Sequence, residues 1–201
     1  MKIRRLAVKP VAFAFYTPHL PIFILLPFLL FLFFITFACT QQELRMKTEL
    51  ILVGRTTDKH FAAGITDYAE RINHYMPFNI ITIPELKNTK NLSEEQQKTA
   101  EGELILKQIQ SQDTVVLLDE HGKEPRSIEL ASWLERKRNT ARRLVFVIGG
   151  PYGFSPAVYQ RANEQLSLSR LTFSHQMVRL VFTEQLYRAC TIIKGEPYHH
   201  E

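Results

Sequence analysis

From residue 46 onward, the hydrophobic positions follow two different periods, and the two kinds of segment alternate. Largely apolar runs typical of strands cover 49–54, 78–83, 114–119 and 144–150. Apolar residues three to four positions apart, typical of amphipathic helices, indicate helices over 58–76, 93–110, 127–138 and 175–193, with a short helix after Pro156. This alternation predicts one α/β domain with a mostly parallel sheet flanked by helices.

Two serines stand where helices are expected to begin. Ser93 opens the sequence S-E-E-Q, which is the pattern of a capping box, so a helix is expected to start directly after it. Ser127 precedes "IELASWLERKR", and we expect its side chain to cap that helix.

The fourth strand ends in backbone almost free of side chains, "VFVIGGPYGFSP" at 145–156, and the third ends in "LLDEHGKEP". Ligands of open α/β sheets bind beyond the carboxyl ends of strands, where glycine lets a ligand approach the backbone. Gly-Gly-Pro also suits a tight turn, so a turn and a ligand site both stay open. No G-x-G-x-x-G opens the first strand, which disfavours a dinucleotide-binding loop, and no G-x-x-x-x-G-K-[ST] occurs, which excludes a P-loop.

Residues 1–45 differ from the rest of the chain. A basic start precedes an uncharged apolar stretch over 20–38, as in a signal peptide or membrane anchor. Only a short polar segment separates this stretch from "MKTELILVG", where a strand begins without a linker. We therefore expect 1–45 to be upstream sequence read from a misassigned start, with Met46 as the initiator. A genuine signal or anchor is the alternative.

The net charge of +5 is concentrated outside the predicted domain. Residues 1–45 hold five basic residues and one acidic residue, so the remainder is nearly neutral and its overall charge predicts no partner. The local cluster "ERKRNTARR" is either an RNA-contacting patch or a solvated helix end; its cations are Arg136, Lys137, Arg138, Arg142 and Arg143.

The two cysteines, Cys39 and Cys190, form no disulfide framework, which favours a reducing compartment and a cytoplasmic protein. Neither Cys-x-x-Cys nor His-Glu-x-x-His occurs, and the adjacent His199 and His200 have no convincing further ligands. We therefore expect no metal site.

Four separated motifs resemble one family: "LLDEHGK", "VIGGPYGFSP", "LSLSRLTFSHQMVRLVFTEQLYRA" and the terminal "PYHHE". In order and spacing they are similar to those of the bacterial 23S rRNA pseudouridine N3-methyltransferases, of the SPOUT or α/β-knot superfamily. The resemblance covers essentially all of 46–201 and none of 1–45. It implies a C-terminal trefoil knot, S-adenosylmethionine as cofactor, a homodimer, and a pseudouridine in helix 69 of the large-subunit rRNA of the ribosome as substrate.

The resemblance also implies a set of cofactor-binding residues: Leu118, Gly150, Ser169, Arg170, Leu171, Thr172, Phe173 and Ser174. In this interpretation the glycines after the fourth strand provide clearance for the ligand. Leu118 and Phe173 would be apolar core in any α/β domain, so their role rests on the resemblance alone. Arg179 lies within the apolar "MVRLVF", where an unpaired buried charge would be costly.

Methylation at N3 requires that the N3 proton leaves. His199 and His200 are candidate proton acceptors, since imidazole has an unperturbed pKa of about 6.5. Tyr198 is expected to orient the base, and His175 is a fourth catalytic candidate that could instead cap a helix. The resemblance implies Arg or Lys at the position of His200, so this chain departs from the family there. Without the resemblance, the segment would be interpreted as a frayed terminus.

Three other functions stay open. The chain could be a SPOUT methyltransferase of another RNA base, or a ribosome-binding knot protein that has lost catalysis. It could also have a membrane-anchored or lipoprotein function if residues 1–45 are a genuine leader.

Overall fold

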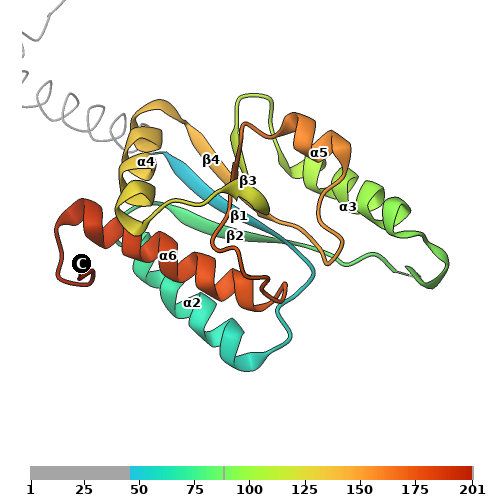
Figure 1. Cartoon of the computed structure of the whole chain (residues 1–201), viewed down its shortest axis with the longest axis horizontal. Coiled ribbons are helices and arrows are strands. Elements are labelled where there is room, and N and C mark those ends of the chain that lie inside the picture. The colour runs from blue at the N-terminus through green and yellow to red at the C-terminus, as the bar shows by residue number, and fades with distance from the viewer. Residues whose placement is uncertain (1–45, 88, 201) are drawn as a thin grey trace, which may run out of the picture. The chain divides into compact units, whose positions relative to one another are not determined.

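The structure is a computed structural model that describes residues 46–87 and 89–200; the predicted leader, 1–45, lies outside the described residues. Five strands form one sheet (Figure 1), and they are β1 (Lys47–Val53), β2 (Phe78–Ile83), β3 (Thr114–Lys123), β4 (Arg143–Ile148) and β5 (Glu164–Leu166). Their order is β2-β1-β4-β3-β5, and each pairing is parallel. The prediction of an α/β domain with a mostly parallel sheet is confirmed, and the strands' carboxyl ends share one edge. The trefoil knot stays a prediction from the resemblance.

Helices cover both faces of this sheet (Figure 1). One face carries α2 (Lys59–Asn73), α4 (Ser127–Thr140) and α6 (Met177–Lys194). The other carries α3 (Glu94–Gln108) and α5 (Pro156–Arg161), and the short 3-10 helix η1 (Thr89–Asn91) precedes α3. Successive residues of β1 enter opposite cores, Leu50 on one face and Ile51 on the other. This two-sided burial explains why the central strands are continuously apolar.

The two predicted helix caps have different outcomes. The capping box at Ser93 is confirmed, because its Oγ accepts from the Gln96 N–H (3.2 Å) and its own N–H donates to Gln96 Oε1 (2.9 Å). The prediction that Ser127 caps a helix is wrong: Ser127 is the first residue of α4 and Arg126 is the cap. The Arg126 N–H donates to the Glu129 carboxylate (2.9 Å), and this acid three residues on sets the helix start one residue earlier.

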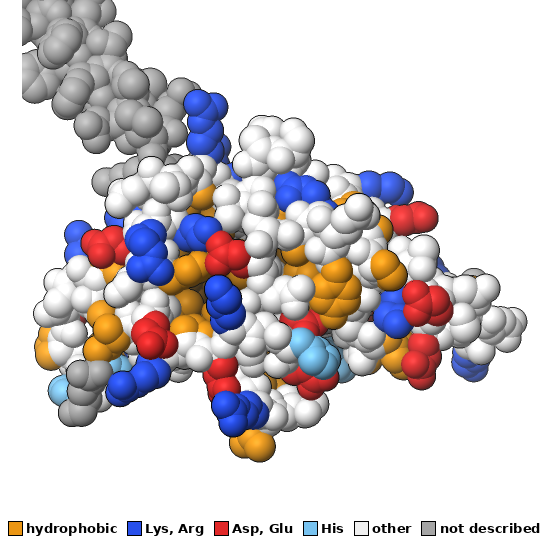
Figure 2. Space-filling view, turned by 45° about the horizontal axis from the view of Figure 1, so that its top comes forward, with side chains coloured by type: hydrophobic (Ala, Val, Ile, Leu, Met, Phe, Trp, Pro, Cys, Tyr) orange, Lys and Arg blue, Asp and Glu red, His pale blue; other side chains and the backbone are white. Residues whose placement is uncertain are grey.

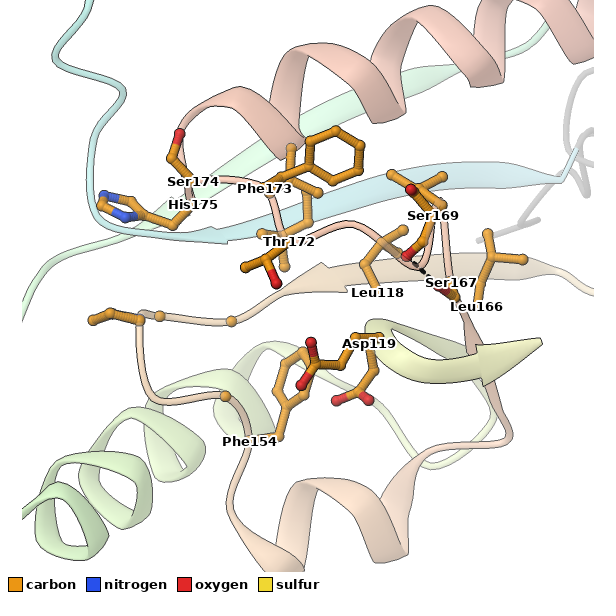
Figure 3. A pocket seen from close by; sticks show the side chains of 18 of the residues that line it. Leu118, Asp119, Phe154, Leu166, Ser167, Ser169, Thr172, Phe173, Ser174 and His175 are labelled. Carbon is orange, nitrogen blue, oxygen red and sulfur yellow. Dashed lines mark hydrogen bonds between the residues drawn. The ribbon is translucent and has the colours of Figure 1, made fainter. Parts of the chain in front are cut away.

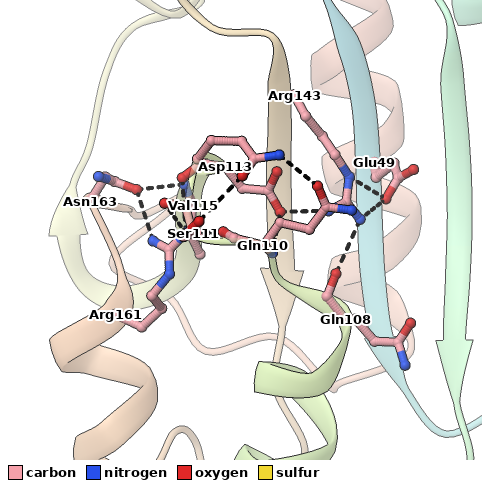
Figure 4. A network of polar contacts seen from close by, with 10 residues as sticks. Glu49, Gln108, Gln110, Ser111, Asp113, Val115, Arg143, Arg161 and Asn163 are labelled. Atoms are coloured by element: carbon pink, nitrogen blue, oxygen red, sulfur yellow. Dashed lines mark hydrogen bonds and ion pairs between the residues drawn. The ribbon is translucent and has the colours of Figure 1, made fainter.

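Part of the basic cluster at 136–143 is used inside the fold. Arg143 pairs with Glu49 and with Asp113, whose Oδ2 lies 2.5 Å from Arg143 Nη1 (Figure 4). Lys137 pairs with Glu164. On the face seen in Figure 2, basic and acidic side chains are interspersed. Within the described part of the chain, the other three cations of the cluster form no ion pair and stay available for outside contacts; they are Arg136, Arg138 and Arg142.

No helix in the described part of the chain is long and apolar enough to cross a bilayer.

Candidate functional site

A cavity of about 420 Å³ lies at the carboxyl ends of β3 and β4 (Figure 3). Leu118, Ile148 and Leu166 supply apolar wall from three neighbouring strands. The fold thus brings together the two strand ends singled out in the sequence, at the edge where open α/β sheets bind ligands. The volume lies within the range of small-molecule and cofactor sites.

The segment before α6 closes the cavity opposite the strand ends. All of the predicted cofactor residues except Arg170 line it, together with His175; these are Leu118, Gly150, Ser169, Leu171, Thr172, Phe173 and Ser174. Arg170 is absent from the lining, because its side chain is 93% exposed and its Nε lies 3.2 Å from the Glu124 carboxylate.

Hydrogen bonds within this segment hold its conformation. The Ser167 hydroxyl donates to the Ser169 carbonyl (3.0 Å), and the Leu171 N–H donates to Ser169 Oγ (2.9 Å). The Met177 N–H donates to Ser174 Oγ (3.2 Å) where α6 begins. Leu171 is nevertheless 76% exposed, so it presents an apolar side chain to solvent at the cavity.

A buried arginine fixes the start of α6 against the end of β1. Arg179 is 1% exposed and donates to the carbonyls of Val53 (2.6 Å) and Gly54 (3.0 Å) and to Thr56 Oγ1 (3.0 Å). The charge suspected from the sequence is therefore buried, and its hydrogen bonds compensate for that burial. These bonds attach the helix that follows the cavity segment to the carboxyl end of β1.

Gly150 separates the cavity from a buried carboxylate. A Cβ on Gly150 would lie 2.4 Å from Glu101 Oε2 and 3.0 Å from Oε1. Glu101 is 8% exposed, and no donor or cation of the described residues pairs with it. Burial raises its pKa, and the nearby Glu85 raises it further. The sequence interpretation assigned the clearance at Gly150 to a ligand, and Glu101 gives a second reason for it.

Sequence reasoning missed several lining residues, of which Asp119 and Glu120 are the charged ones. Both directly follow Leu118 in "LLDEHGK", so the rule about strand carboxyl ends could have found them. Phe154, within "GGPYGF", and Ser167 also line the cavity. The described residues contain no cluster of three His, Cys, Asp or Glu side chains that could hold a metal ion.

The C-terminal tail packs on the helices. The Tyr198 hydroxyl donates to Glu184 Oε1 (3.1 Å), and its ring centroid lies 4.9 Å from that of Tyr187. The Arg188 guanidinium lies 4.8 Å from the Tyr198 ring centroid and pairs with Glu184 (2.5 Å). Burial and the adjacent Tyr68 hydroxyl raise the pKa of Tyr198, so this phenol stays protonated at neutral pH.

These contacts hold the tail away from the cavity of its own chain. His175 lines the cavity just before α6, whereas Tyr198, His199 and His200 follow the other end of that helix (Figure 1). Tyr198 folds back onto Glu184 and Tyr187 of α6, and the cavity lining includes none of the three tail residues. One chain therefore brings His175, but not the three tail residues, to the cavity.

Comparison with known proteins agrees with this architecture. Residues 46–199 match the family described as "Predicted SPOUT methyltransferase". Over 157 residues, which are 78% of this chain and 100% of the relative, the chain is 62% identical to Ribosomal RNA large subunit methyltransferase H of Phocaeicola vulgatus. Over the same shares, identity is 61% to the protein of that name in Bacteroides fragilis and 52% to that in Porphyromonas gingivalis. The chain therefore belongs to the SPOUT methyltransferase family.

Proposed function

We propose that this protein uses S-adenosylmethionine to methylate N3 of a pseudouridine in helix 69 of 23S rRNA. The observation that carries the proposal is the 62% identity to a large-subunit rRNA methyltransferase over that relative's full length. The position N3 and helix 69 come from the resemblance of the four motifs. Mass mapping of 23S rRNA from a deletion strain tests both. Loss of a methyl group from another base would leave a SPOUT methyltransferase of different specificity.

The cavity fits the proposed cofactor in size and chemistry. Leu118 and Phe173 offer apolar surface for a flat base, and Gly150 lets a ligand approach the backbone. The hydroxyl side chains Ser169, Thr172 and Ser174 add polar contacts. When bound, S-adenosylmethionine supplies an electrophilic methyl group at its sulfonium.

The chain's own residues are proposed to position the base and remove its proton. His175 lies at the cavity, where an imidazole within reach of N3 could accept the proton. Tyr198 is proposed to orient the base, and His199 and His200 to take the proton or contact RNA. Because none of the three tail residues lines the cavity of its own chain, we propose that they act at the cavity of a second copy.

A homodimer follows from this arrangement, and paired inactive subunits test it. A variant lacking Tyr198–Glu201 should still form dimers and retain much of its cofactor affinity, but it should not transfer labelled methyl groups to ribosomes from a strain without the enzyme. A Gly150→Val variant should fail at its cavity, because the added side chain strikes Glu101 and displaces the cavity wall. Mixed dimers of the two contain one intact cavity and one intact tail, so they should recover up to half of the wild-type activity.

Two controls decide the outcome. Each variant alone should stay inactive at the protein concentration used for mixing, and light scattering should report dimers. Full-rate methylation by the truncated protein would mean that the tail is only a frayed terminus. If the truncated protein is inactive and mixed dimers of confirmed composition recover no activity, the tail does not act across subunits.

We further propose that residues 46–201 form the whole methyltransferase domain, that Met46 is the initiator, and that the enzyme is cytoplasmic. Alignment over the relatives' full length supports this boundary. Intact mass of the native protein should correspond to a chain that begins at Met46. A chain that retains 1–45, or one that begins at Cys39, would contradict the boundary and favour a leader.

A further inference from the structure

The cavity is lined by acids without a balancing Lys or Arg. Asp119 and Glu120 contribute carboxylates, and the lining also contains the imidazole of His175. Behind the wall, the carboxylate of Glu101 lies against Gly150. The carboxylates of the lining therefore contribute a negative potential at a ligand in this cavity, and no Lys or Arg of the lining offsets it.

Asp119 is the more strongly fixed of the two lining acids. Its side chain is 8% exposed and lies on the same side of the cavity as Phe154 (Figure 3). Its Oδ2 accepts from the Tyr159 hydroxyl (2.5 Å) and its Oδ1 accepts from the His121 backbone N–H (2.9 Å), while Nδ1 of the exposed His121 ring lies 3.0 Å from the same Oδ1. Glu120 is exposed, so water screens its charge more. The field of Asp119 thus acts at a fixed position and in a less polar environment.

The hydrogen bonds of Asp119 keep it ionised. Burial alone would raise the pKa of Asp119, but the bonds from Tyr159 and His121 outweigh burial and lower it below its usual value. Burial and the neighbouring carboxylate raise the pKa of Tyr159, so the phenol remains a donor. At neutral pH the carboxylate is charged.

The proposed cofactor and its demethylated product differ in one charge that such a field can distinguish. S-adenosylmethionine carries a sulfonium, and when the S–CH3 bond breaks, its electron pair stays on sulfur and leaves a neutral thioether. The ammonium and carboxylate groups are common to both molecules. We propose that Asp119 makes this cavity selective for the positively charged cofactor over its neutral product. Product release is then favoured by the loss of charge that accompanies transfer.

This inference rests on the proposed function, and calorimetry tests it without an activity assay. Dissociation constants for S-adenosylmethionine and S-adenosylhomocysteine should be measured for wild type, Asp119→Asn and Glu103→Gln. Glu103 is an exposed acid on α3 outside the lining, so its variant controls for net charge. One unit charge within about 12 Å at an effective dielectric constant of about 20 changes affinity about tenfold. The cofactor-to-product affinity ratio should fall about tenfold in Asp119→Asn and stay constant in Glu103→Gln.

Two further measurements keep the test decisive if Asp119→Asn folds poorly. Tyr159→Phe removes one hydrogen bond but leaves those from His121 and the carboxylate itself, so it should retain the wild-type ratio even if both affinities fall. In wild type, an analogue with a tertiary amine in place of the sulfonium should bind more tightly as the amine gains its proton. Product affinity over the same pH range controls for titration of the protein.

The outcomes separate this inference from the proposal on which it rests. Wild-type protein that binds neither ligand would overturn the proposed cofactor and the inference with it. Binding of both ligands with an unchanged ratio in folded Asp119→Asn would overturn the inference alone. The inference would also be overturned if protonation of the amine analogue left its affinity unchanged.

Discussion

Gly150→Ala tests the close packing between the cavity wall and α3. The added methyl carbon would lie 2.4 Å from Glu101 Oε2 and 3.0 Å from both Cδ and Oε1. These contacts are too short for either group to stay in place. The carboxylate is at the end of a flexible side chain, but Glu101 is only 8% exposed, so its movement must displace packed neighbours.

The expected cost is that of overpacking a well-filled site, about 1–3 kcal/mol in the free energy of unfolding. Glu101→Ala removes the group that the new methyl would strike. In that background Gly150→Ala should cost less than about 0.5 kcal/mol. The double-mutant cycle should therefore give a coupling of about 1–3 kcal/mol, in the direction of relief.

Urea unfolding of the four proteins measures this coupling, with equal slopes required for a valid comparison. Gly149→Ala is the matched control, because the atoms nearest to its Cβ would belong to Phe154 (Cε1 at 3.1 Å) and Gly153, not to Glu101. Its effect on the free energy of unfolding should add to that of Glu101→Ala. If the effects of Gly150→Ala and Glu101→Ala also add within about 0.5 kcal/mol, the packing argument is refuted. Cofactor affinity of the double variant then shows whether a methyl group at Gly150 also obstructs the ligand.

Three further predictions concern stability. Arg179→Met should lower the free energy of unfolding by about 2–5 kcal/mol in urea titrations, because the carbonyls of Val53 and Gly54 lose a buried donor; a change below 1 kcal/mol would contradict this. Burial raises the pKa of Glu101, so the folded protein holds the Glu101 proton more tightly than the unfolded chain does, and the free energy of unfolding falls as pH rises through that pKa. Glu101→Gln should remove this decline, and parallel pH profiles for variant and wild type would exclude it. Ser93→Ala should cost about 1 kcal/mol through loss of the capping box, with unchanged cofactor affinity, and an unshifted urea midpoint would show that the cap contributes nothing.

The sequence predicted the elements whose apolar residues have a clear period, and the structure shows why others escaped. Strand β5 is three residues long and its central part is polar, so no periodic pattern marks it. The prediction ended β3 at residue 119, whereas the strand continues to Lys123 through an irregular pairing with β5. Such an extension depends on a partner strand far along the chain, and a local pattern does not contain that information.

The site was predictable as far as it follows from strand ends and from family motifs. The surroundings of individual side chains, such as their burial and their ion-pair partners, could not be predicted. Glu101 and Gly102 occupy the buried face of α3, where a search for apolar residues does not look for a carboxylate. Lys137 and Arg143 belong to a basic run in the sequence, yet each meets an acid from a distant strand. Pairing of this kind depends on the tertiary arrangement, which composition and spacing do not specify.

The length of helix α6 fixes the position and direction of the tail that follows it. It runs without interruption from the residues after His175 to Gly195, whose φ of 70° ends it in a left-handed cap. Inserting a single residue in such a helix moves everything beyond it by about 1.5 Å and rotates it by about 100°. The tail would then face a new direction although no side chain had been altered. The direction of the tail thus depends on the number of residues in α6 as well as on their identity.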